Sequence, residues 1–127
     1  MSSLLLPRAA IASVWLYQGL WCKLLGRTPH HQEIIGMVPF LNASLAHWAL
    51  VALGSVECVL AVWVVSGIRA REAALVQIFL LVSMNAAGLF WAYRAIPDPV
   101  GMLFQNFVFL SLAWVAAGEL RPHAAAC

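Results

Sequence analysis

Six polar side chains within otherwise apolar stretches are the candidates for binding a ligand or moving a proton. They are Gln18, Lys23, Glu57, Asn85, Gln105 and Asn106. Glu57 lies near the middle of an apolar run, 45–67, that is long enough to cross a bilayer, since a helix needs about 20 residues to span the hydrocarbon core. A carboxylate at that depth costs about 2.5–3.5 kcal/mol on insertion scales, so it must face protein or a wet cavity, or carry a proton. We expect Glu57 to be neutral unless Lys23 or a cation reaches it.

The helix that carries Glu57 presents one face of mostly small residues. This face consists of Ala46, Leu50, Gly54, Glu57 and Ala61, which are spaced by three or four positions. Small residues let the backbone of a neighbouring helix approach closely. The spacing therefore predicts that Glu57 points into a helix bundle.

The other polar candidates are expected at similar depths. At 1.5 Å per residue, Gln18, Asn85 and Asn106 lie roughly 9–12 Å below the outer surface and Glu57 roughly 18 Å below it. Lys23, about one turn higher, either snorkels to the outer headgroups or reaches down toward the others. The spacing therefore predicts a polar cluster to which four different helices contribute.

The composition is that of an integral membrane protein. Hydrophobic residues make up 64% of the 127 residues and charged residues 9%, whereas about 25% of residues are charged in soluble proteins. The mean hydropathy is +0.90. The net charge of +2 comes from few residues, with no basic cluster that would bind nucleic acid. The expected partners are membrane lipids and other membrane or membrane-associated proteins.

Apolar spans and breaks define a single helical domain, 1–127. The predicted spans cover about 9–25, 45–67, 73–93 and 101–120. Between the first two, a short interfacial helix is expected to begin at Pro29 and end at Pro39, with Ile34, Ile35, Met37 and Val38 on one face. The fold class is thus an all-α, integral membrane four-helix bundle of up-down-up-down topology, with a short interfacial helix between spans one and two.

Basic residues favour one orientation of this bundle in an inner (cytoplasmic) membrane. The end that holds the termini carries Arg8, Arg69, Arg71 and Arg121, and the other end carries Lys23, Arg27 and Arg94. The positive-inside rule therefore predicts cytoplasmic termini. The six tryptophans lie mostly toward span ends, as expected of interfacial belts.

Each polar candidate also has a structural interpretation. Glu57 could equally well serve to join helices by hydrogen bonds or to bind a ligand or move a proton. The amides, Gln18, Asn85, Gln105 and Asn106, often form interhelical hydrogen bonds worth about 0.6 kcal/mol each. No residue is assigned a catalytic role. The histidines lack a spacing such as HExxH, so no metal site is predicted. The absence of a CxxC motif disfavours a dithiol redox enzyme, and no intrinsic cofactor is predicted.

Three segments resemble the DoxX-like family of small four-helix membrane proteins. They are GLWCKLLG at 19–26, GSVECVLAVWVVSGIRAR at 54–71 and DPVGMLFQN at 98–106. The resemblance implies that the chain works with other proteins. Some members are subunits of quinone-reducing or oxidative-stress membrane complexes, and distant relatives act as assembly chaperones or cargo receptors.

Two functions therefore stay open. In the first, the chain is a small subunit of a redox-linked membrane system, whose polar site around Glu57 handles protons or binds a quinone or lipid. In the second, it is a non-catalytic assembly or accessory subunit, in which the same polar groups only hold the bundle together. We favour the first because polar groups from four helices are expected at similar depths.

Overall fold

The computed structural model describes residues 4–27 and 29–118, and this part of the chain is helical, with short turns between the helices. Three of its helices are long and apolar enough to cross a membrane. They are α3 (Ala43–Ser66), α4 (Ala70–Trp91) and α5 (Pro99–Ala116). The predicted spans were 45–67, 73–93 and 101–120. The helices begin two or three residues before the predicted starts and end one, two and four residues before the predicted ends, and assignments of helix ends commonly differ by one or two residues. The predicted end of the last span at Leu120 and the residues after it lie outside the described part.

The first long helical segment changes its geometry halfway. It begins as α1 (Leu5–Leu16) and continues as η1 (Tyr17–Leu24), a π-helix. The wider turn is visible in the bond from the Leu25 amide to the Leu20 carbonyl, five residues back, at 2.8 Å. The predicted span, about 9–25, is thus helical but starts at Leu5, and hydrophobic spacing gave no sign of the π-helix. π-Helical turns are rare and often occur at functional sites.

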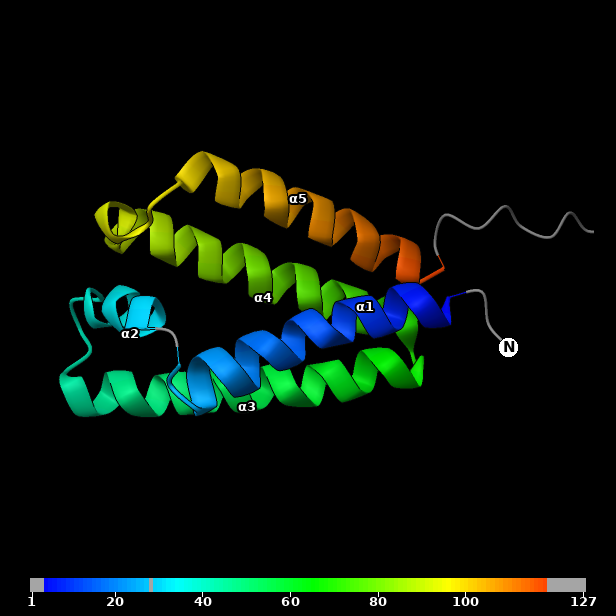
Figure 1. The fold of residues 1–127 in the computed structure, drawn as a ribbon, viewed down its shortest axis with the longest axis horizontal. Helices are drawn as coiled ribbons and strands as arrows, with labels where there is room; N and C mark the ends of the chain where they lie inside the picture. The colour runs from blue at the N-terminus through cyan, green and yellow to red at the C-terminus, as the bar shows by residue number, and fades with distance from the viewer. Residues whose placement is uncertain (1–3, 28, 119–127) are drawn as a thin grey trace, which may run out of the picture.

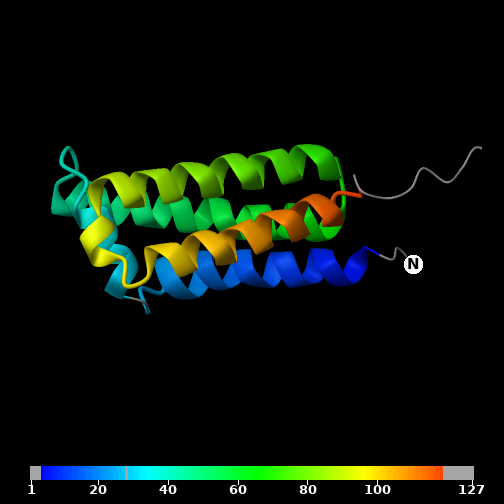
Figure 2. The same ribbon diagram turned by 90° about the horizontal axis from the view of Figure 1, so that it is seen from above.

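Consecutive long segments run in opposite directions and lie side by side (Figure 1). The α1–η1 segment packs along α3, α1 also contacts α5, and α4 packs against α5 and α3. The view from above shows the same arrangement, with both described chain ends at one end of the molecule (Figure 2). Two helix starts are fixed by capping side chains, since Asn42 accepts from the Leu45 amide at 2.8 Å and Asp98 accepts from the Gly101 amide at 2.9 Å.

The short helix α2 (Pro29–Gly36) lies across the end of the bundle that is opposite the chain ends (Figure 1). It contacts η1, α3, α4 and the short 3₁₀-helix η2 (Tyr93–Ala95). The helix ends two residues earlier than predicted, because tighter bonds from the Met37 and Val38 amides, each reaching back three residues, close it after Gly36 and before Pro39. As a result, Met37 is 40% exposed and does not share the inner face.

The end of the bundle near the chain termini holds an apolar core. The core consists of Ile11, Ala12, Trp15, Leu60, Ala61, Val64, Ala73, Ala113 and Ala116. Trp15 is 2% exposed, and its indole N–H donates to Gln77 Oε1 at 2.9 Å. Trp15 is therefore not an interfacial residue, although the six tryptophans as a set were expected to lie mostly in interfacial belts. A buried indole needs a hydrogen-bond acceptor, and Gln77 provides it.

Candidate functional site

A pair of glycines brings the π-helix η1 into close contact with α3. A Cβ added to Gly19 would lie 2.6 Å from the Gly54 carbonyl oxygen and 2.9 Å from Glu57 Cβ. A Cβ on Gly54 would lie 2.8 Å from the Gly19 carbonyl oxygen and 3.0 Å from Lys23 Cβ. Only glycine fits at either position without a shift of one helix. The close approach expected on the small-residue face of α3 occurs at Gly54, and its partner is Gly19.

This crossing places Lys23 against Glu57. Lys23 Nζ lies 3.0 Å from Glu57 Oε2, with the Lys23 side chain 6% exposed and the Glu57 side chain 0% exposed. Of the two orientations considered for Lys23, the structure shows the one that reaches inward. Glu57 was expected to be neutral only if neither Lys23 nor a cation reached it. Because the Lys23 amine lies beside the carboxyl group, that condition is not met. Glu57 Oε1 has no hydrogen-bond partner among the described residues.

The glycine crossing makes a direct prediction about stability. Gly19→Ala is expected to lower the free energy of unfolding by about 1–3 kcal/mol, because the added methyl group meets the α3 backbone. Gly36→Ala is the matched control, because a Cβ there has no atom within 4 Å. Unfolding in mixed micelles with increasing denaturing detergent measures both variants. Equal stability of the two variants would contradict the close crossing.

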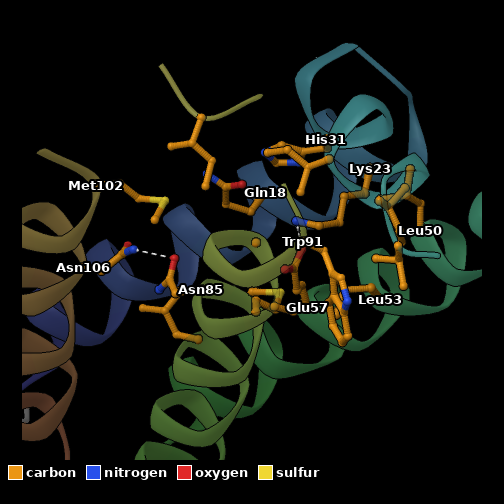
Figure 3. Close-up of a pocket in the computed structure, with 18 of the residues that line it drawn as sticks. Gln18, Lys23, His31, Leu50, Leu53, Glu57, Asn85, Trp91, Met102 and Asn106 are labelled. Carbon is orange, nitrogen blue, oxygen red and sulfur yellow. Dashed lines mark hydrogen bonds and ion pairs between the residues drawn. The ribbon is translucent and has the colours of Figure 1, made fainter. Parts of the chain in front are cut away.

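The ion pair lies at the edge of a cavity of about 660 Å³. The six polar residues singled out from the sequence all line this cavity: Gln18, Lys23, Glu57, Asn85, Gln105 and Asn106. They come from η1, α3, α4 and α5, so the structure brings the predicted polar groups of the four long segments together (Figure 3). A volume of this size is within the range of sites that bind small molecules.

The amides in the cavity differ in their contacts. Asn106 Nδ2 donates to Asn85 Oδ1 at 2.9 Å, which joins α5 to α4. This bond is the interhelical tie that the structural interpretation expected, although both residues also line the cavity. Gln18 is half-buried and Gln105 is exposed, and neither forms a hydrogen bond within the described part of the chain.

Several residues that line the cavity were not identified as site residues from the sequence. The segment around α2 contributes His31, Ile34, Ile35, Val38, Phe40 and Leu41, and other helices add Trp91, Met84 and Met102. The residues around α2 could have been identified from the apolar face that was expected for this helix. The sequence gave no comparable signal for Trp91 or the methionines, because aromatic and thioether side chains are common in any apolar span.

The cavity and the apolar core occupy different halves of the bundle. The cavity is lined by residues near α2 and η2 and by the adjoining ends of the long helices, whereas the core lies toward the chain termini. Trp15 lies at the boundary and contributes to both. Access to Lys23 from water or headgroups therefore comes from the α2 end, because the tightly packed core lies across the other half.

The chemistry of the cavity wall is mostly apolar with one balanced pair of charges. Apart from His31, the described lining residues with ionisable side chains are Lys23 and Glu57, and these two have opposite charge. Among the residues that the structure describes, no group of three or more His, Cys, Asp or Glu side chains is placed to hold a metal ion. The arrangement suits an uncharged, largely apolar molecule with a polar group directed at the ion pair.

The fold and this site define a small helical membrane protein with an ion pair and a cavity inside its apolar bundle. Residues 12–114 match the DoxX-like family, and the chain belongs to that family. The resemblance found in the three sequence segments is thereby confirmed. No curated protein and no solved structure matched the chain.

Proposed function

We propose that the chain crosses the membrane four times, as an up-down-up-down bundle within one domain. The α1–η1 segment supplies the fourth span, because its 12 and 8 residues are together long enough to cross the hydrocarbon core. Arg8, Arg69 and Arg71 lie at the end with the chain termini, which supports cytoplasmic termini in an inner membrane. In this orientation α2 lies at the outer surface.

We further propose that the cavity holds the polar end of a lipophilic molecule in a redox-linked membrane system. The observation that carries this proposal is the buried pair of Lys23 and Glu57 at the edge of a 660 Å³ cavity. Charges inside a membrane are costly, so an ion pair that only joined helices would be expected to be closely packed by protein on all sides. This pair instead borders a cavity. A quinone-type head group fits the largely apolar wall and the donors from lysine and amide side chains. The redox cofactor itself is then carried by a partner protein.

Filling the cavity tests this proposal. Ala87 lines the cavity, so Ala87→Phe is expected to occupy part of its volume and to reduce the bound lipophilic molecule at least about fivefold. Val59→Phe adds a similar ring on the outer face of α3, where Val59 is 68% exposed, and serves as the control. Mass spectrometry of lipophilic molecules extracted from both purified proteins measures the effect. Equal retention by the two variants would contradict binding in the cavity.

A second observation supports the alternative of an accessory subunit. A smaller groove of about 400 Å³ lies on the outer side of α4 and α5, lined by Ile78, Phe107, Leu110, Ser111, Trp114 and Val115. Phe107 is 69% exposed. In that alternative a helix of another membrane protein occupies the groove, and the polar cluster only stabilises the bundle. The two functions thus assign importance to different faces of α5.

A further inference from the structure

Lys23 and Glu57 differ in their access to the cavity. The Lys23 side chain retains 6% of its surface, whereas the Glu57 side chain retains 0% and both of its carboxylate oxygens are enclosed. The close-up shows the Lys23 amine between His31 above it and Glu57 below it (Figure 3). A molecule in the cavity therefore meets the ammonium group before it meets the carboxylate.

We infer that Lys23 is the residue that contacts the ligand, and that Glu57 is a positioning residue that holds the ammonium group and balances its charge. An ammonium group has three N–H donors, and Glu57 engages one side of it. The remaining donors can bond to an acceptor oxygen on the ligand. This inference rests on the proposed function, because it assumes that the cavity holds a lipophilic molecule.

The balanced charge also selects the class of ligand. Because Glu57 neutralises Lys23, a ligand with its own negative charge would bring an unpaired charge into a low-dielectric site, which is costly. The bound molecule is therefore uncharged and carries a carbonyl-type acceptor, as a quinone does. A fatty carboxylate is disfavoured as long as Glu57 is present. The carboxylate thus determines selectivity without touching the ligand.

Lys23 is the single lysine of the chain, which allows a direct measurement. The full chain is labelled with ¹⁵N-lysine, placed in lipid nanodiscs and titrated with decylbenzoquinone or with decanoate. We expect decylbenzoquinone to shift the single lysine side-chain signal and to bind at least about tenfold more tightly than decanoate, because decanoate would bring an unpaired negative charge into the site. Arg94→Met is the control, because Arg94 is exposed and does not line the cavity.

Two variants separate the roles. Glu57→Gln removes the balancing charge, so decanoate is expected to bind at least about tenfold more tightly than to the wild type, while decylbenzoquinone still shifts the lysine signal. The double variant Lys23→Met with Glu57→Gln leaves no unpaired charge, and it is expected to bind decylbenzoquinone at least about tenfold more weakly. Tryptophan fluorescence, with Trp91 in the cavity wall, measures binding in this variant without lysine.

The outcomes distinguish this inference from the proposed function. If the wild type binds decylbenzoquinone but the double variant binds it equally well, or if Glu57→Gln leaves decanoate binding unchanged, the assignment of roles is overturned. If the wild type and the control bind neither probe, the proposed function itself is contradicted, and the inference that rests on it falls with it.

Discussion

Lys23→Met is expected to lower the free energy of unfolding by about 3–5 kcal/mol at neutral pH, the largest stability effect of any change considered. The substitution keeps a chain of similar length and removes the ammonium group that lies 3.0 Å from Glu57 Oε2. The fully buried carboxyl group of Glu57 then either stays ionised without a partner or takes up a proton. Breaking a buried ion pair in this way costs more than the pair contributes, because both the desolvation of the remaining charge and its protonation at neutral pH are unfavourable.

The compensating variant makes this prediction specific. Lys23→Met combined with Glu57→Gln is expected to recover most of the lost stability, since neither charge remains. Unfolding in mixed micelles measures both proteins, with Arg94→Met as the control for loss of an exposed cation at the same end of the bundle. Additive losses in the double variant would show that the two side chains do not interact.

The second large effect is expected in activity rather than stability. In the native membrane complex, the folded double variant Lys23→Met with Glu57→Gln is expected to reduce the redox activity of the complex at least about tenfold. The reason is that the ligand no longer receives a hydrogen bond from the ammonium group of Lys23. Phe107→Arg, on the outer face of α5, is expected to keep that activity if the site lies in the cavity. Electron transfer through the purified complex measures both.

The reverse pattern would favour the accessory function. Full activity in the double variant, together with loss of assembly in Phe107→Arg, would mean that the polar cluster only holds the bundle and that the outer groove binds a partner. An arginine in that groove places a charge where apolar helix packing is expected. Co-purification of the partner proteins with each variant measures assembly separately from activity.

The burial of α3 could be predicted from the sequence because helical spacing alone decides which residues share a face. Ala46, Leu50, Gly54, Glu57 and Ala61 are all buried, as their spacing indicated. The start of α5 was predicted two residues late, at 101, although Asp98 and Pro99 mark it by capping and by a fixed backbone angle. The common cavity of the polar residues followed from counting depth along each span.

Other features were not predictable because they depend on pairings between distant segments. The direction of Lys23 depends on the π-helical turn and on the contact of Gly19 with Gly54, and neither is encoded in hydrophobic spacing. The burial of Trp15 depends on Gln77, which lies 62 residues away in the sequence. The end of α2 at Gly36 depends on a local turn that apolar spacing does not specify.

The most direct test of a ligand site in the cavity is an experimental structure of the native complex in lipid nanodiscs. We expect a lipophilic molecule between α2, η1 and α4, with an acceptor oxygen within hydrogen-bond distance of Lys23 Nζ and with Glu57 behind the ammonium group. A collapsed, dry cavity in which Glu57 is fully hydrogen-bonded by protein groups, alongside a partner helix in the outer groove of α4 and α5, would contradict it.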